Sequence, residues 1–277
     1  MDNPSSNNRN SGVKPRKRYQ SDEIYKKLYA YYSEYYRDLL HLKNWNERIV
    51  DNRYYEEDTF GKKAVQMALD NGVDITSDSK VLVVGCGTGA ELFHLYMFHT
   101  KDVYGIEPFE PGIEICRMKA AETGLPQSHI LKARAEQLPF EEETFDAIIC
   151  FTVIEHVDNV EQSFREIYRV LKKGAQAFLL YPDYRYPEEQ HFKIKTFPPA
   201  LMPALTRLHL KIKGKYSDFF ETLNFITPPV TRTILDMLEI DYSIKTTTVG
   251  HSVPALTRTY CRLLGISRNQ LVLIKKH

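Results

Sequence analysis

Short apolar runs alternate with amphipathic segments through the middle of the chain. The clearest run is Val81–Val84, in which three of four residues are β-branched, as in a buried strand. Four similar runs predict further strands, at residues 103–107, 129–132, 145–150 and 177–181. Three segments between them have helical spacing of apolar residues, at residues 89–98, 110–123 and 158–172. Strands that alternate with helices predict a parallel, doubly wound α/β sheet.

Glycine and proline mark the ends of these elements. Gly124 follows the second helical segment and Gly174 follows the third, and we expect each glycine to end its helix. The alternation itself stops at Pro182. Residues 182–229 are rich in proline and aromatic residues and have no strand–helix rhythm. We therefore expect an insertion that covers the carboxyl edge of the sheet.

Helical and strand patterns also flank the central sheet. Before it, residues 22–50 and 60–71 have helical spacing, and Ser21 is placed to cap the first of these helices. After the insertion, the pattern predicts one helix and two strands, at residues 231–238, 242–249 and 271–274. Because no proper crossover helix separates the two late strands, we expect them to form an antiparallel pair.

Composition excludes several classes of protein. The formal net charge is +1 over 277 residues, so no overall field draws the chain to nucleic acid. The chain has no run of eighteen apolar residues, which a membrane-spanning helix would need. The N-terminus lacks the apolar core of a signal peptide. The cysteines lack zinc-ligand spacing, which indicates reduced thiols in a cytoplasmic protein. They are Cys86, Cys116, Cys150 and Cys261. The basic residues 14–18 are predicted to belong to a solvated tail.

Candidate chemistry begins directly after the first strand. Gly85, Gly87 and Gly89 follow Val84, and a helical segment begins near Ala90. Glycines let a backbone turn tightly and approach a ligand without a Cβ in the way. A strand, a glycine turn and a helix N-terminus together form a nucleotide-cofactor site. Taken alone, the motif also fits the dinucleotide pattern G-x-G-x-x-G/A, so it leaves an NAD(P) site open.

An acidic residue stands where the ribose of such a cofactor would lie. Glu107 ends the second strand, 18 residues after Gly89. A carboxylate at this place can accept hydrogen bonds from both ribose hydroxyls of a nucleotide whose other end rests on the glycine turn. Glu107 is therefore a candidate cofactor-binding residue.

Further motifs follow the glycine turn in a fixed order. They are Glu107-Pro108, Ala135–Phe140, Phe145-Asp146, Glu155–Val157 and Arg169–Gly174. Over residues 80–181, the ordered set resembles class I S-adenosylmethionine-dependent methyltransferases of the small-molecule branch. The resemblance implies an enzyme with S-adenosyl-L-methionine as its cofactor. It also implies a Rossmann-like, mostly parallel sheet of seven strands with an antiparallel last strand.

With this resemblance, the chain divides into five parts. They are a flexible tail, an N-terminal helical extension, a cofactor-binding core, a lid or acceptor insertion, and a C-terminal segment that completes the core sheet. In the same order they cover residues 1–20, 21–72, 73–181, 182–229 and 230–277.

The resemblance implies which residues bind the cofactor. Gly85, Cys86, Gly87 and Gly89 would pass beneath its methionine and ribose parts, and Glu107 would hold the ribose diol. The other implied contacts are Pro108, Ala135 and Glu136 at the adenine, Phe151 and Thr152 near the methionine, and Glu155 and His156 facing the pocket.

Two positions depart from the pattern of the resembled family. Arg134 stands where an Asp often precedes the Ala of this motif, so a side-chain hydrogen bond to the adenine amine would have to come from Glu136. Gly174-Ala175 stands where a Gly-Gly pair is common, and one glycine suffices to stop a helix.

Methyl transfer from a sulfonium is an in-line displacement, and a hydroxyl acceptor also needs a base. His191, early in the insertion, is the first candidate because its ordinary pKa suits proton removal near neutrality. His156 is the second candidate. Alternatively, His191 is an ordinary histidine of the lid, and His156 is a structural part of a helix start. Glu155, His156 and Asp158 could suggest a metal, but no further ligand cluster supports one, so we expect none.

The acceptor site is implied to lie between the insertion and the N-terminal helices. Aromatic residues of the insertion suit an apolar, aromatic or glycosidic acceptor, such as a hydroxyl of a natural product, glycan or lipid-linked metabolite. These residues are Tyr184, Tyr186, Phe192, Phe197, Phe219, Phe220 and Phe225. The tyrosines within residues 29–36 form either a packing surface or a pocket wall. Residues 201–216 combine apolar and basic side chains, which fits a solvated lid helix or a peripheral membrane contact.

Two other functions stay open from the residues alone. One is an NAD(P)-dependent oxidoreductase, which the glycine turn permits but the later motifs disfavour. The other is a non-catalytic scaffold that keeps the methyltransferase fold. The identity of the acceptor, the atom methylated and the oligomeric state are not encoded in any pattern that we find.

Overall fold

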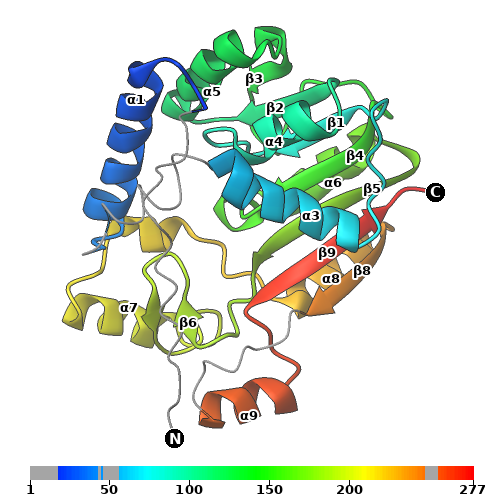
Figure 1. Ribbon diagram of the computed structural model, residues 1–277. Coiled ribbons are helices and arrows are strands. Elements are labelled where there is room, and N and C mark those ends of the chain that lie inside the picture. Colours follow the sequence, from blue (N-terminus) through cyan, green and yellow to red (C-terminus); the bar gives the residue numbers. More distant parts are fainter. Residues whose placement is uncertain (1–17, 43–44, 46–55, 247–254) are drawn as a thin grey trace, which may run out of the picture.

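The structure, a computed structural model, describes residues 18–42, 45, 56–246 and 255–277. Its centre is a seven-stranded sheet of order β3-β2-β1-β4-β5-β9-β8 (Figure 1). Strands β1 to β5 run parallel, and β9 runs antiparallel to both of its neighbours. The strands are β1 Val81–Val84, β2 Val103–Glu107, β3 Ile130–Lys132, β4 Phe145–Phe151, β5 Leu171–Pro182, β8 Asp241–Thr246 and β9 Asn269–Lys275. This arrangement confirms the expected Rossmann-like sheet with an antiparallel last strand.

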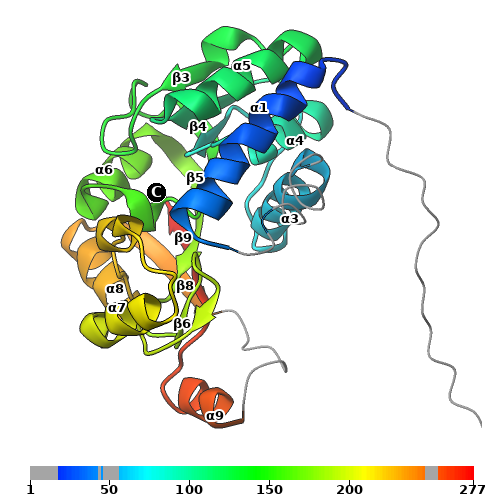
Figure 2. The same cartoon turned by 90° about the vertical axis from the view of Figure 1, so that its left-hand side faces the viewer.

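Helices cover both faces of the sheet (Figures 1 and 2). Apolar side chains of α3, α4 and α5 pack on one face, and those of α6 and α8 pack on the other. Burial on both faces explains why the strands read as continuous apolar runs. The helices are α3 Lys62–Asp70, α4 Ala90–Phe98, α5 Glu110–Thr123, α6 Val160–Val170 and α8 Pro228–Met237. The four cysteines are free and buried, as expected.

Two segments before the sheet are helical. Helix α1 (Asp22–Ser33) is capped by Ser21, whose hydroxyl accepts the N–H of Glu23 at 3.2 Å, and it continues as a π-helix over Glu34–Leu39. A second π-helix, η2 (Glu57–Gly61), leads into α3. Most of residues 43–50 of the predicted first helix, and the basic residues 14–17, lie outside the described residues.

The predicted role of Gly174 is wrong, whereas that of Gly124 is confirmed. Gly124 follows α5 in a left-handed conformation with φ of 83°. Helix α6 instead ends at Val170, and β5 begins directly at Leu171. Gly174 lies inside β5 with φ of 79°, where the register of β5 against β4 shifts. The helix has already ended four residues before this glycine. Gly174 therefore permits an irregularity within a strand and does not end a helix.

The insertion lies at the carboxyl edge of the parallel strands. It contains a short hairpin of β6 (Glu188–Glu189) and β7 (Ile194–Lys195), then α7 (Pro203–Ile212) and the 3-10 helix η5 (Asp218–Thr222). After α8 and β8, helix α9 (Ala255–Leu263) precedes β9. Within the described ranges, no helix has the length and apolar character needed to cross a membrane.

Candidate active site

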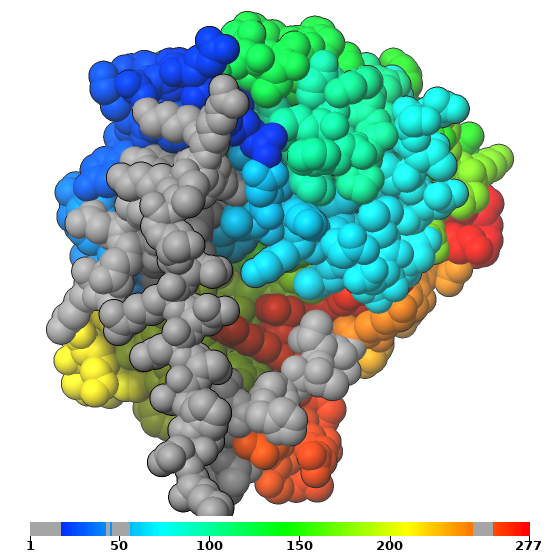
Figure 3. All heavy atoms as spheres, in the orientation of Figure 1, coloured from blue at the N-terminus to red at the C-terminus, as the bar shows by residue number. Residues whose placement is uncertain are grey.

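A cavity of about 1060 Å³ opens where β1, β2 and β4 end. Its walls come from the glycine turn, from the N-terminal helices and from the insertion. In Figure 3, the blue N-terminal helices lie above the yellow part of the insertion on the same side of the molecule. Segments that are far apart in the sequence therefore enclose one site. The tyrosines that line it are Tyr31, Tyr32, Tyr35 and Tyr36, so the pocket-wall interpretation of this helix is supported.

The glycine turn has the backbone that its sequence predicts. Gly85, Gly87 and Gly89 all have positive φ, at 68°, 53° and 98°. A Cβ on Gly87 would meet no atom within 4 Å, so this wall of the cavity is open to a ligand. Gly85 and Cys86 also line the cavity. Gly89 is not part of the lining. It begins α4, and a Cβ there would lie 2.5 Å from Phe93.

Glu107 lies at the cavity with its carboxylate held by the backbone. Its Oε2 accepts the N–H of Gly87 at 3.0 Å, and its Oε1 accepts the N–H of Phe109 at 3.0 Å. Burial raises the pKa of Glu107, and the two N–H groups oppose that rise. Because an ionised carboxylate has about four acceptor sites, about two remain unused.

The predicted adenine contacts Pro108, Ala135 and Glu136 also line the cavity. The carboxylate of Glu136 has a further task, since Oε1 accepts the N–H groups of Asp158 at 2.6 Å and Asn159 at 3.2 Å. Glu136 thereby holds the chain just before α6. This contact crosses more than twenty residues, and no local pattern indicated it.

The predicted methionine contacts Phe151 and Thr152 lie at the end of β4 and line the cavity as well. Thr152 has φ of 56°, and its N–H donates to the carbonyl of Leu180 at 2.7 Å. A residue other than glycine rarely adopts this conformation, and such strain gathers at functional sites.

A buried ionic cluster lies behind the glycine turn, and the sequence did not reveal it. We call Glu56, Glu57, Lys119, Thr88 and Tyr32 the lysine cluster. The ammonium of Lys119 donates to Glu56 at 2.5 Å, to Glu57 at 2.9 Å and to the carbonyl of Thr88 at 2.9 Å. The side chains of Lys119, Glu56 and Glu57 are all 0% exposed. Burial alone lowers the pKa of Lys119, but Glu56 and Glu57 outweigh it and raise that pKa well above its ordinary value.

The lysine cluster joins the N-terminal helix to the glycine turn. The hydroxyl of Tyr32 donates to Glu56 at 3.0 Å and lies 2.6 Å from the hydroxyl of Thr88. The hydroxyl of Thr88 in turn donates to Glu56 at 2.8 Å. One signal could have indicated this cluster: Lys119 has helical spacing with the buried residues Ile115 and Cys116.

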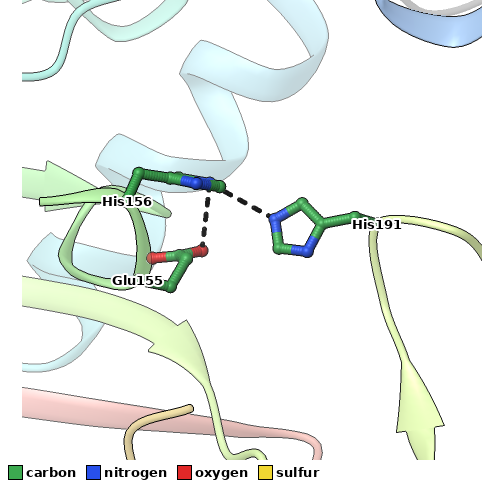
Figure 4. A group of neighbouring side chains, drawn as sticks. All are labelled: Glu155, His156 and His191. Carbon is green, nitrogen blue, oxygen red and sulfur yellow. Dashed lines mark hydrogen bonds and ion pairs between the residues drawn. The ribbon is translucent and has the colours of Figure 1, made fainter. Parts of the chain in front are cut away.

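A second polar cluster lies at the other side of the cavity, and Figure 4 shows three of its four side chains. We call Glu155, His156, His191 and Glu189 the histidine cluster. The Nε2 atoms of His156 and His191 are 3.3 Å apart, and Oε1 of Glu155 lies 3.9 Å from Nε2 of His156. Nδ1 of His191 lies 3.0 Å from Oε1 of Glu189. Sequence reasoning selected both histidines, but not their contact across 35 residues.

Burial shifts the pKa of two members of this cluster, Glu155 and His156. It raises the pKa of Glu155 to about 7, while the neighbouring His191 opposes the rise. Neither carboxylate oxygen of Glu155 has a hydrogen bond, and the side chain is 0% exposed. Loss of water contact, followed by the influence of His191, lowers the pKa of His156 to about 3. His156 is therefore neutral near pH 7.

The insertion fixes the histidine cluster from outside the core. The N–H of Asn224 donates to the carbonyl of Glu155 at 2.8 Å, and its side-chain amide donates to the carbonyl of Val157 at 2.5 Å. The ring of Phe219 lies 5.6 Å from that of His156 and 5.5 Å from that of His191. The turn and the two imidazoles are thus held by packing and by backbone hydrogen bonds.

The aromatic residues of the insertion serve several purposes, so the expectation of a shared acceptor lining needs correction. Phe219 lines the main cavity. Tyr186 and Phe197 line a separate cavity of about 340 Å³. Phe192 and Phe220 are fully buried in a cluster with α1. Most of these rings therefore fix the insertion to the N-terminal helix.

The comparisons with known proteins agree with this geometry. Residues 82–179 match the methyltransferase domain family. An uncharacterised protein of Mycobacterium tuberculosis is 30% identical over 157 residues, which cover 54% of this chain and 50% of that protein. A sterol 24-C-methyltransferase of Schizosaccharomyces pombe is 27% identical over 134 residues, which cover 47% of this chain and 35% of that enzyme. The matches thus span half or less of the length of these relatives.

A solved structure of a protein from Pyrococcus horikoshii has the same fold. Its TM-score is 0.55 at 18% identity, and the alignment covers 89% of this chain and 99% of that one. The chain carries a class I S-adenosylmethionine-dependent methyltransferase domain, and S-adenosylmethionine is the cofactor of this domain class. The open wall at Gly87 and the unused acceptor sites of Glu107 fit that cofactor.

Proposed function

We propose that this chain transfers the methyl group of S-adenosylmethionine to a hydroxyl oxygen of an apolar small molecule, such as a natural product, a glycan or a lipid-linked metabolite. The supporting observation is that one cavity has two kinds of wall. One wall has the glycine turn and Glu107, and another has the side chains of His156 and His191.

The first wall would hold the cofactor. Gly85, Cys86 and Gly87 would lie beneath its methionine and ribose parts, and the free acceptor sites of Glu107 would take the ribose hydroxyls. The bound cofactor supplies an electrophilic methyl group on a sulfonium. The remaining contacts that we propose are Pro108, Ala135 and Glu136 around the adenine and Phe151 and Thr152 at the methionine end.

The second wall would receive the acceptor. If Nδ1 of His191 donates its proton to Glu189, the lone pair of Nε2 points toward His156 and the cavity. We assign the proton of the acceptor hydroxyl to this pair of histidines, with His191 as the main group. Both imidazoles contact the ring of Phe219, and the side chain of His191 is only 10% exposed.

Several observations support an apolar acceptor. Tyr31, Tyr35, Phe109 and Phe219 line the cavity. The sterol enzyme among the relatives is named for an apolar substrate. Helix α7 exposes apolar side chains next to basic ones, which fits contact with a membrane surface that would deliver such an acceptor. The exposed apolar residues are Leu201, Met202, Leu205, Leu208 and Ile212.

Two binding measurements and one assay test this proposal. Calorimetry with S-adenosylhomocysteine should show one site per chain, and NAD should not bind. A panel of hydroxylated apolar acceptors with labelled S-adenosylmethionine should give a methylated product. Binding of NAD instead would favour an oxidoreductase, and cofactor binding without any transfer would favour a non-catalytic scaffold.

The variant His191→Ala tests the assignment of the proton. Removal of a positioned acid or base costs about 100-fold or more in turnover, whereas affinity for S-adenosylhomocysteine should not change. His277→Ala is the matched control, since that imidazole is 67% exposed near the C-terminus. Unchanged turnover in His191→Ala would restrict His191 to packing.

A further inference from the structure

The histidine cluster contains an acid whose carboxylate accepts no hydrogen bond from any described residue. Glu155 is fully buried, and both of its carboxylate oxygens lack a hydrogen-bond partner. A buried ionised group without compensation is costly, so such groups are normally paired or coordinate a metal. The titratable groups that influence Glu155 are His191 and Glu189, and neither is a permanent cation. Among the described residues, no lysine or arginine is thus one of the groups that shift the pKa of this acid.

Two imidazole nitrogens point at the same place. Nε2 of His156, from the turn after β4, and Nε2 of His191, from the β6–β7 hairpin, are 3.3 Å apart (Figure 4). Glu155, His156 and His191 each offer one ligand atom, and these three atoms all lie within 4.8 Å of one another. At metal–nitrogen bonds of about 2.0–2.1 Å, neighbouring ligand atoms of an ion are about 3.0–3.4 Å apart. The two nitrogens already have this spacing, and the carboxylate needs only a small movement.

We propose that Glu155, His156 and His191 bind one divalent transition-metal ion. Two imidazoles and one carboxylate suit Zn²⁺ and similar ions, whereas Mg²⁺ and Ca²⁺ prefer sets of oxygen ligands. Three protein ligands also leave coordination positions open, as in catalytic sites. All three residues line the cavity, so an open position faces the place where the acceptor would bind.

Glu189 completes the site as an orienting group. Its Oε1 lies 3.0 Å from Nδ1 of His191, and its Oε2 accepts the N–H of Phe192 at 2.7 Å. A metal-ligating histidine normally donates its other N–H to a carboxylate or a carbonyl, which fixes the ring and its tautomer. Because Glu189 is 0% exposed, this orientation is maintained away from water.

The role of the ion rests on the proposed function, although its binding does not. The acceptor oxygen would bond to the ion, and the O–H proton would leave to water because the ion lowers the pKa of a bound hydroxyl. That oxygen would form the new bond to the methyl carbon while the carbon–sulfur bond breaks. The electron pair of that bond would remain on the sulfur of S-adenosylhomocysteine. In the metal-bound chain, the ion would therefore take over from the two histidines the task of removing the proton.

A direct binding measurement tests the site. The full chain without an affinity tag is freed of metal with a chelator and titrated with Zn²⁺ against a chromophoric competitor. Co²⁺ serves as a spectroscopic probe of its ligands. We expect one ion per chain and a visible absorption band of Co²⁺, and we expect Mg²⁺ not to displace it. Failure of the folded chain to bind either ion at one equivalent would overturn the proposal.

Variants locate the ion. Glu155→Gln and His191→Ala should each weaken Zn²⁺ binding by at least about 100-fold, and Glu189→Gln should weaken it by about 10–100-fold because it only orients His191. His277→Ala should bind as the unmodified chain does. Equal binding by Glu155→Gln, His191→Ala and the unmodified chain would place the ion elsewhere and contradict the proposal. Each variant is first shown to unfold in urea in one cooperative transition, as the unmodified chain does, which verifies the fold.

The same samples separate this inference from the proposed function. Binding of S-adenosylhomocysteine without binding of Zn²⁺ would leave the methyltransferase assignment and remove the metal. Binding of Zn²⁺ that depends on Glu155 and His191, without methyl transfer to any acceptor, would support the metal and contradict the proposed activity. Once an acceptor is identified, transfer should stop in chelator and return with Zn²⁺.

Discussion

The cavity lies between two buried clusters of acids, and the chain treats them differently. In the lysine cluster, Lys119 supplies a cation to Glu56 and Glu57, and Tyr32 and Thr88 add hydrogen bonds. In the histidine cluster, the carboxylate of Glu155 has neither a hydrogen bond nor a lysine or arginine among the groups that shift its pKa.

This difference in pairing indicates different roles for the two clusters. A paired and hydrogen-bonded cluster joins structural elements, and the lysine cluster joins α1, η2, α5 and the glycine turn. An unpaired buried acid next to two imidazoles can still bind a proton or an ion from outside the chain. A structural cluster should therefore fail when its own cation is removed, and a functional cluster should respond to protons and added ions.

The largest effect is expected for Lys119→Met. The change leaves two buried carboxylates without a cation, which costs about 3–5 kcal/mol in the free energy of unfolding. Urea unfolding measures it. The control is Lys27→Met, because Lys27 of α1 pairs with Glu114 of α5 at 2.8 Å but on the surface. Its effect should lie within experimental error, and equal losses in both variants would contradict the comparison.

A pH dependence should follow from Glu155 in the metal-free chain. Its pKa is about 7 when folded and about 4.5 when unfolded, so the folded chain holds more protons between these values. This acid therefore contributes stability at pH 4, and the contribution is lost as the pH rises through 7. The loss is on the order of 3 kcal/mol.

Comparison with Glu155→Gln isolates this effect, because the other residues of the histidine cluster are the same in both chains. Unfolding is measured from pH 4 to pH 8 in chelator, and the stability difference between the two chains should change in this range. Parallel curves would mean that Glu155 titrates at its ordinary pKa and is better compensated than the structure indicates.

A smaller effect is expected at Glu107, a buried acid that is satisfied by backbone N–H groups. Glu107→Ala removes the acceptor for the ribose hydroxyls. Hydrogen bonds to a charged group are worth about 1.5–3 kcal/mol, so affinity for S-adenosylhomocysteine should fall by about 10–100-fold. Calorimetry measures the change, and Glu110→Ala, which removes an exposed acid at the start of α5, should retain full affinity. Full affinity in Glu107→Ala would show that the ribose lies elsewhere.

The smallest effect is expected for Tyr32→Phe. The change removes one hydroxyl from the lysine cluster and leaves Glu56 with its bonds to Lys119 and Thr88, so the chain should lose about 1 kcal/mol of stability. The control is Tyr242→Phe, whose hydroxyl donates to the exposed Asp236 at 2.8 Å. A loss of about 3 kcal/mol or more in Tyr32→Phe would mean that the lysine cluster acts as one cooperative unit and does not depend on Lys119 alone.

The side of the cavity that carries the glycine turn and Glu107 could be predicted because it is encoded locally. Each part follows directly after a strand, and parallel strands bring their carboxyl ends to one edge. The order of motifs thus predicted that Gly87, Glu107, Ala135 and Thr152 lie together. The error at Gly174 arose from the same local reasoning, since a glycine after an amphipathic segment does not reveal that the next strand has already begun.

The acceptor side could not be predicted in the same way. His156 and His191 are brought together by Asn224 and by the packing of Phe192 and Phe219. No periodic pattern in the sequence indicates these contacts. Glu56 and Lys119 are likewise 63 positions apart. The pattern identified the residue types that carry chemistry, but tertiary packing decides which of them meet.

The carbonyl of Thr88 has a consequence for how the cofactor arrives. It accepts a hydrogen bond from the ammonium of Lys119, directly beneath the bend where the glycines lie. The bend therefore has its final shape in the empty protein, and little conformational entropy remains to be lost on association. We therefore expect S-adenosylmethionine to bind to a preformed site. The association rate should depend on access to the cavity and not on a rearrangement of the bend.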